Sequence, residues 1–334
     1  WIDFVFLTDS EGSRQAMIDS LTETQSFTDQ VLLLQTKLQI NKIANEKKRK
    51  LIHDDLTTAL TPMFALNKIY FFGSSVTGLD VQGSDLDVYI ANVREQNRPE
   101  VQTLKIVRNL IFKCRKFCDV LLISGAKIPI IKCIHTKTQI CCDLNIKNKL
   151  SVCNSQLIRY YLSLDDKMRP LMVMVKFWAD LYDLKKVNFF SSYALYMMVI
   201  FYLQHEPYKI PSVKDLQRDI AANIVDGWNC AFELQGFANS ALKNESLVNL
   251  VAGFFRFYSR FDYTSKVISV FMGTGIDKTR FVKPCRLPSC YQLYVNHKDS
   301  LLVNSGICIQ DPFEHARNVA ASVPLQCVGR FIHM

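Results

Sequence analysis

The sequence predicts an α+β protein whose first half folds around a small mixed sheet and whose second half is mainly helical. Short apolar runs with strand spacing occur at 68–72, 85–91, 118–123, 128–135 and 139–146. Helical spacing replaces them from Ser155 onward. The chain has 334 residues, of which 49% are hydrophobic, so it can bury one large core or two domains.

Helices are expected both before and after the first two strands in the sequence. Apolar spacing predicts a helix over 27–53 and a second helix that begins at Asp54 and runs toward Phe64. A further helix carries Leu104 and Val107 and precedes the remaining strands. We therefore expect the sheet to have its helices on one face.

The second half contains the longest apolar stretch, from Tyr193 to Leu203. This stretch is shorter than the roughly 20 residues that span a bilayer, and no charged-then-apolar leader opens the chain. We expect a buried helix there and no membrane association. Pro170 suits the first turn of another helix, whose stripe of Leu171 and Trp178 belongs to the core.

The composition favours an intracellular protein with a polyanionic partner. The eleven cysteines lack Cys-x-x-Cys pairs, which argues against a disulfide framework or a zinc module. A net charge of +9 favours a polyanion, although solvated basic faces are also common in proteins that bind none.

Asp85 and Asp87 are the most informative residues of the chain. Residues i and i+2 of a strand point to the same face, so these two carboxylates project together while Leu86 and Val88 face the core. Paired carboxylates suit Mg²⁺, which prefers oxygen ligands and accompanies substrate phosphates. An isolated Asp-x-Asp is more often a surface loop, so further residues have to support this interpretation.

Two neighbouring motifs provide that support. Gly73 and Ser74 follow a strand end, where glycine permits close backbone approach and a short helix can offer N–H groups to phosphate oxygens. Asp143 lies in the apolar segment 140–146. A buried carboxylate needs a partner, which is either a paired core charge or, as we favour, a metal ion shared with Asp85 and Asp87.

These motifs resemble the terminal nucleotidyltransferases of the DNA polymerase β superfamily, specifically the cytoplasmic poly(A)/poly(U) polymerase branch with the terminal uridylyltransferases. The segments 170–179, 191–204 and 307–314 are similar to that family's central-domain motifs. The resemblance implies a two-lobed, polymerase β-like fold, in which a mixed-sheet catalytic domain is inserted in a mainly helical central (PAP-associated) domain. The cleft would lie between the lobes.

The implied domains are an N-terminal helical segment at 1–53 that packs with the central domain, a catalytic domain at 54–154 and the central domain at 155–334. The residues that match the family's nucleotide-binding positions are Gly73, Ser74, Asn148, Asn154, Ser155, Lys176, Ser192, Tyr193, Asp311, Glu314 and Arg317.

The resemblance also implies a role for each group of these positions. Asn148, Asn154 and Ser155 would approach ribose and base, and Lys176 and Ser192 the phosphates. Tyr193 would stack on the base, near the acidic groups of Asp311 and Glu314. The plainer alternatives are helix packing for Tyr193 and a solvated surface side chain for Arg317.

Basic residues crowd around the catalytic half. We predict RNA-phosphate contacts for Lys47, Lys48, Arg49, Lys50 and Lys147. For the run at 47–50, the alternative is a helix C-terminus decorated with cations.

The predicted activity is template-independent addition of UMP from UTP to RNA 3′ ends. Asp85, Asp87 and Asp143 would hold two Mg²⁺ ions, with Mn²⁺ as a substitute, and Asp143 would also serve as general base. We expect a cytoplasmic monomer whose partners are the RNA 3′ end, UTP and proteins of RNA decay or processing.

Three alternatives remain open at this point. ATP is the second nucleotide, because Arg317 occupies the position where the family's uridylyl-selective enzymes have a histidine. A catalytically weak RNA-binding scaffold would have the same fold. An enzyme that transfers a nucleotide to a small molecule would share the catalytic motif.

Overall fold

A computed structural model describes residues 19–20, 23, 26–37, 42–80, 84–93, 98–125, 128–182, 184, 189–234 and 240–324. The chain divides into two compact units. Among the described residues, the first unit holds 42–159, and the second holds 19–37 together with 160–324. The first unit is therefore inserted in the sequence of the second, while the domain boundaries at 53/54 and 154/155 stay a prediction.

The first unit is built on a five-stranded mixed sheet with the order β1-β2-β5-β4-β3. The strands are β1 (Lys68–Phe72), β2 (Leu86–Ala91), β3 (Phe117–Ile123), β4 (Ile130–His135) and β5 (Ile140–Asn145). β2 and β5 are parallel, and the other neighbours are antiparallel. The α+β class and the mixed sheet are confirmed.

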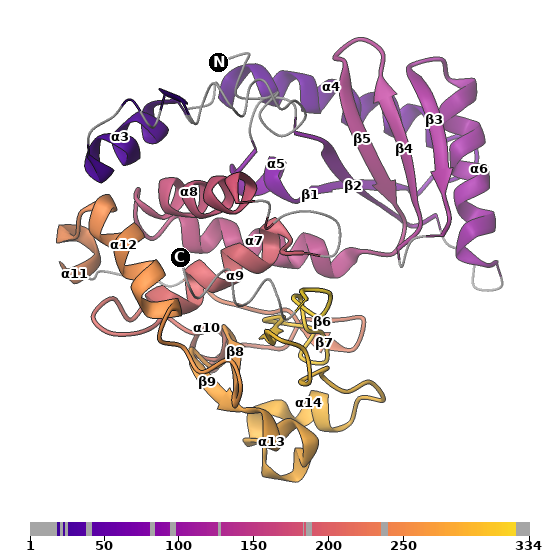
Figure 1. Cartoon of the computed structure of the whole chain (residues 1–334). Helices are drawn as coiled ribbons and strands as arrows, with labels where there is room; N and C mark the ends of the chain where they lie inside the picture. Colours follow the sequence, from indigo (N-terminus) through magenta and orange to yellow (C-terminus); the bar gives the residue numbers. More distant parts are fainter. Residues whose placement is uncertain are drawn as a thin grey trace. The chain divides into compact units, whose positions relative to one another are not determined.

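Alternation along these strands separates a core face from a polar face. Val88 pairs with Leu144, which pairs with Ile131, and all three are buried. They share a core with the helices α4 (Lys42–Leu60) and α6 (Glu100–Lys113), which contact each other and the sheet (Figure 1). Residues one position away along each strand point to the opposite face.

Helix α4 differs from the expectation of a new helix at Asp54, because it continues through this residue to Leu60. Ile52 and Leu56 lie one turn apart on its buried face, and Asp54 lies on its exposed side. Burial of one continuous apolar face outweighs the capping preference of the aspartates. The run at 47–50 is consequently in the helix interior, so its interpretation as a helix C-terminus is wrong.

One short helix and one long helix complete the first unit. The short helix α5 (Ser74–Thr77) follows β1 directly, as predicted, and ends at Gly78 in the left-handed conformation. Helix α7 (Lys149–Leu162) begins after β5 and runs across the division between the units.

The second unit is mainly helical, as predicted. Its principal helices are α3 (Phe27–Lys37), α8 (Met168–Leu181), α9 (Ser192–Leu203) and α12 (Leu247–Tyr258). Every residue of α9 from Ala194 to Leu203 is buried, and α3 packs against α8 and α12. None of the helices in the described ranges is long and apolar enough to cross a membrane.

The remaining elements are short. A three-stranded sheet has the order β10-β8-β9. The elements are α10 (Val213–Leu216), β6 (Ile224–Val225), β7 (Trp228–Asn229), α11 (Ser240–Asn244), β8 (Lys266–Ser269), β9 (Thr274–Asp277), α13 (Lys278–Val282), η1 (Pro284–Arg286), η2 (Ser289–Tyr291), α14 (Gln292–Val295) and β10 (Ile309–Gln310).

Candidate active site

The predicted catalytic aspartates lie in one row across the sheet of the first unit. Asp87 in β2 pairs with Phe72 in β1 and with Asp143 in β5, and Asp143 pairs with Lys132 in β4. Directly paired residues project from the same face. Asp85 precedes β2 by one residue and is two positions from Asp87, so three carboxylates gather on the face opposite the core.

This gathering is electrostatically unfavourable for the charged carboxylates. Burial, followed by the neighbouring Asp143 and Asp85, raises the pKa of Asp87 to about 7, and Lys132 only partly opposes the shift. The pKa of Asp143 is also raised, first by burial and then by Asp85, against the opposing effect of Lys132. The row therefore favours a proton or another cation.

Lys132 is the cation that the chain itself supplies. Its Nζ lies 3.2 Å from Oδ2 of Asp85 and 3.7 Å from Oδ1 of Asp143. Burial lowers the pKa of Lys132, but Asp143 and Asp85 outweigh this effect and raise it. Sequence reasoning did not single out Lys132 as a site residue. The available signal was a lysine between the apolar residues Ile131 and Cys133 of a strand.

The donor set fits a hard divalent cation. Oδ1 of Asp143 is buried without a hydrogen-bond partner, and carboxylate oxygens are the ligands that Mg²⁺ prefers. As the side chains stand, no three His, Cys, Asp or Glu residues of the described ranges converge closely enough to hold an ion. Lys132 lies against two of the three carboxylates, so metal binding at the row requires this lysine side chain to move away from them.

Gly73 brings the backbone of the predicted phosphate turn against the acidic row. Its φ of 69° is unfavourable for other residues, and a Cβ at this position would collide with Oδ2 of Asp87. The N–H of Gly73 donates to Oγ of Ser155 at 2.7 Å, and this hydroxyl donates to the carbonyl of Ser151 at 2.7 Å. Ser155 therefore holds the turn in place, a contact that its predicted approach to the ribose did not include.

The two predicted asparagines flank the start of α7. Asn154 is buried in the first unit, and the N–H of Asn148 donates to Oδ1 of Asn145 at 3.1 Å. Ser74 opens α5 and is partly buried. Their contacts with a nucleotide stay predictions.

The predicted RNA-contacting residues divide into two groups. Lys47, Lys48 and Lys50 are exposed on α4, and Lys147 is exposed with Glu100 at 3.8 Å. Arg49 instead turns toward the phosphate turn. Its Nη1 donates to the carbonyl of Ser75 at 2.9 Å and lies 3.6 Å from Oδ2 of Asp80, so Arg49 ties α4 to both ends of the α5 segment.

In the second unit, Tyr193 and the acidic segment 311–317 form a connected group. The hydroxyl of Tyr193 donates to Oδ2 of Asp311 at 3.1 Å. Oδ1 of Asp311 accepts the backbone N–H groups of Phe313 and Glu314, both at 3.0 Å. Asp311 is completely buried, so it organises the segment from within rather than presenting a free carboxylate.

Arg317 completes this group. Its Nη1 lies 3.9 Å from Oδ2 of Asp311 and 3.7 Å from Oε2 of Glu314, and the side chain is 36% exposed. The interpretation of Arg317 as a purely solvated arginine does not match these contacts. His315, two positions earlier, is buried against Phe271 and Tyr291 and belongs to the core.

The last two predicted residues lie on neighbouring helices of the same unit. Lys176 is in α8, and Ser192 is the first residue of α9, where Ser191 caps the helix by accepting the N–H of Ala194 at 3.1 Å. Both predicted residues are partly buried. Their phosphate contacts stay predictions.

Two family models match the chain. The model described as "Poly(A) RNA polymerase, mitochondrial-like, central palm domain" matches residues 27–163. The model "Cid1 family poly A polymerase" matches residues 246–317. The first contains the acidic row, and the second contains Asp311, Glu314 and Arg317.

Individual proteins agree with these matches. The "Speckle targeted PIP5K1A-regulated poly(A) polymerase" of Danio rerio is 28% identical over 91% of this chain and 44% of its own length. The chain spans about half the length of the curated relatives it matches.

Solved structures show the same fold. The structure of mtPAP in complex with ATPγS has a TM-score of 0.77 at 22% identity, over 96% of this chain and 68% of that one. A Cid1 poly(U) polymerase structure, "Mg 3′-dATP bound", has a TM-score of 0.72 at 25% identity, over 92% of this chain and 93% of that one. With its acidic row and its Asp311 segment each inside a matched region, the chain belongs to the Cid1-type family of poly(A) and poly(U) polymerases and has a polymerase β-like nucleotidyltransferase fold.

Proposed function

We propose that the chain adds nucleotides to RNA 3′ ends without a template, with UTP as the preferred substrate. The observation that carries the proposal is the row of Asp85, Asp87 and Asp143 beside the Gly73 turn. Membership of an RNA-tailing family supports the reaction class. A cytoplasmic location and a monomeric state stay predictions.

The acidic row has the chemistry that nucleotidyl transfer requires. Bound there, Mg²⁺ would activate the RNA 3′-hydroxyl and stabilise the leaving pyrophosphate. Asp143 is the candidate acceptor of the hydroxyl proton, because burial raises its pKa and Oδ1 has no hydrogen-bond partner. Gly73 and Ser74 would bring backbone N–H groups to the triphosphate.

The preference for UTP is argued from Arg317. A uracil edge offers two carbonyl acceptors and one N–H donor, whereas the edge of adenine presents an amino donor. A guanidinium held by Asp311 and Glu314 can donate to a uracil carbonyl and would face the adenine amino group donor to donor. Tyr193 would stack on the base, with its hydroxyl fixed by Asp311.

Poly(A)-type activity with ATP is the second candidate. The absence of a histidine at position 317 and the poly(A) polymerase name of the Danio rerio relative favour it. A catalytically weak scaffold is less favoured, because all three carboxylates are present and share one face of the sheet.

The test is incorporation from each of the four nucleoside triphosphates into a labelled oligoribonucleotide with Mg²⁺, followed by UTP against ATP in competition. Arg317→Ala is expected to raise the use of ATP relative to UTP about 10-fold. Arg280→Ala, an exposed arginine of the same unit, is the matched control and is expected to leave the ratio unchanged. Equal incorporation of A and U by the native chain would replace the uridylyl assignment with the adenylyl one.

A further inference from the structure

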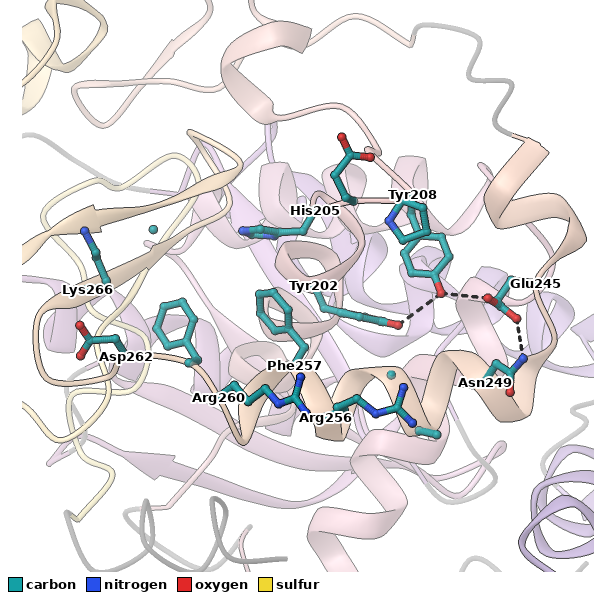
Figure 2. Close-up of a pocket in the computed structure, with 16 residues that line it drawn as sticks. Tyr202, His205, Tyr208, Glu245, Asn249, Arg256, Phe257, Arg260, Asp262 and Lys266 are labelled. Atoms are coloured by element: carbon teal, nitrogen blue, oxygen red, sulfur yellow. Dashed lines mark hydrogen bonds between the residues drawn. The ribbon is translucent and has the colours of Figure 1, made fainter.

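A pocket of about 820 Å³ lies in the second unit, away from the Tyr193 group. Its walls are the end of α9, the turn that follows it, α12 and the β8–β9 hairpin (Figure 2). Tyr202 lines it and lies nine positions after Tyr193 on α9, which is roughly 13 Å along the helix. The pocket is therefore no part of the site described above.

The floor of the pocket is aromatic. The ring centroids of Phe257 and His205 are 4.9 Å apart, and those of Phe257 and Tyr202 are 5.7 Å apart. Gly253 packs closely against the hydroxyl of Tyr202, since a Cβ there would collide with it. The floor offers rigid rings that bind an apolar side chain with little loss of conformational entropy.

Two arginines stand beside this floor. Arg256 is on α12, and Arg260 lies four positions later, just past the C-terminal end of this helix. Both are exposed, and neither forms an ion pair with a carboxylate of the described residues. Lys266, the remaining cation of the pocket, is already paired with Asp277 at 3.0 Å. Figure 2 shows the two guanidinium groups side by side along the pocket.

His205 adds a hydrogen-bond acceptor. Its Nδ1 lies 2.7 Å from the carbonyl of Phe201 and must carry the hydrogen, since a carbonyl only accepts. Burial lowers the pKa of His205, which favours the neutral ring. Nε2 then has a lone pair that can accept an N–H group.

The charge balance of the pocket distinguishes between the possible occupants. Three acidic side chains, Glu206, Glu245 and Asp262, line it together with the three cationic ones. Asp262 lies beyond one end of the arginine pair and Glu245 beyond the other (Figure 2). Grooves that follow a nucleic-acid backbone are positively charged throughout. Here the unpaired positive charge is confined to the two arginines and carboxylates flank it, so the pocket suits a short segment with two or three acidic residues better than it suits RNA. Arginine and aromatic residues together are typical of protein interfaces.

We propose that the pocket docks a short acidic segment of a partner protein. Carboxylates of the segment would pair with Arg256 and Arg260. An aromatic or branched aliphatic side chain between these carboxylates would rest on the partly exposed ring of Phe257, and a backbone N–H would donate to His205. The site would recruit the enzyme to other proteins and does not depend on the nucleotide it uses.

The experiment measures fluorescence polarisation of a fluorescein-labelled hexapeptide pool that alternates Asp or Glu with Phe, Trp or Leu. A matched pool carries Lys or Arg in place of the acids. The double variant Arg256→Glu/Arg260→Glu is expected to lose affinity for the acidic pool about 10-fold or more. Arg280→Glu/Arg286→Glu, with the same charge change on exposed residues of the same unit, is expected to bind as the native chain does.

RNA binding and tailing of an oligoribonucleotide are measured on the same proteins and are expected to be unchanged by the pocket variant. The milder Arg256→Gln/Arg260→Gln pair replaces it if charge reversal lowers the thermal unfolding midpoint. Equal binding of both pools, acidic-pool binding that survives loss of the arginines, or a loss of RNA affinity in the pocket variant would each overturn the proposal, the last in favour of an RNA contact.

Discussion

The carboxylates in the acidic row of the first unit and in the acidic segment of the second unit have opposite environments. Asp311 is completely buried, yet it accepts two backbone N–H groups and the hydroxyl of Tyr193. Asp87 and Asp143 are more exposed, yet their pKa values are raised, and Lys132 lies near only one of them at 3.7 Å. The row therefore has more carboxylates than its one lysine neutralises, whereas the carboxylate of the segment is satisfied by groups of its own chain.

This contrast predicts that the largest losses of activity come from the row. Asp143→Ala is expected to lower the single-turnover rate of nucleotide addition on the order of 10³-fold and to leave substantial triphosphate affinity, because Asp85 and Asp87 remain. Asp85→Ala is expected to lower both the single-turnover rate and the triphosphate affinity. Rapid-quench assays and equilibrium binding of the nucleotide separate the two effects. Near-native incorporation by Asp143→Ala would remove this residue from the site.

A substitution at Gly73 tests whether activity depends on the close approach of the phosphate turn to the acidic row. Gly73→Ala forces an L-residue into a positive φ and drives a methyl group into the carboxylate of Asp87. We expect kcat/KM to fall about 100-fold, as for other small displacements of catalytic groups. Gly78→Ala is the control, since its φ of 80° is also positive but nothing lies within 4 Å of the added Cβ. Equal losses in both variants would mean that backbone strain alone is responsible.

The sequence predicted the parts of the row that depend on local periodicity. The spacing of Asp85 and Asp87 in a strand, the turn at Gly73 and the strand of Asp143 all follow from alternation and glycine placement. The pairing of β2 with β5 joins residues 56 positions apart in sequence, as Asp87 and Asp143 are, and the position of Lys132 opposite Asp143 depends on register. Neither is encoded in any local pattern, which is why the sequence alone does not place Lys132 beside the aspartates.

The pH dependence of stability is a third test of the row. The pKa of Asp87 is about 7 in the folded protein against an ordinary value of 3.8. The folded state therefore binds the proton more tightly than the unfolded chain, and its stability falls as the pH rises through this interval. Thermal unfolding in EDTA is expected to show this fall, and Asp87→Asn is expected to flatten it.

Magnesium and a matched variant complete this test. Mg²⁺ is expected to raise the unfolding midpoint more above pH 7 than below it, because deprotonated carboxylates bind the ion. Asp54→Asn changes an exposed aspartate of the same unit and is expected to keep the native profile. If the unfolding midpoint of Asp87→Asn depended on pH as that of the native chain does, Asp87 would be excluded as the source of the pH dependence.

The smallest expected effects distinguish two kinds of cation within one turn of α4. Lys47, Lys48 and Lys50 are exposed and free to meet RNA phosphates, so their joint change to Glu is expected to weaken RNA binding and to reduce its salt slope by about 2.

Arg49 holds the carbonyl of Ser75 and lies near Asp80. Arg49→Gln is therefore expected to raise KM for the triphosphate a few-fold, with RNA affinity preserved. The charge pattern of 47–50 does not distinguish Arg49 from the three lysines, because only the tertiary structure shows that Arg49 already contacts Ser75 and Asp80. If Arg49→Gln weakened RNA binding as the lysine variant does and left KM unchanged, the run would act as one RNA-binding surface after all.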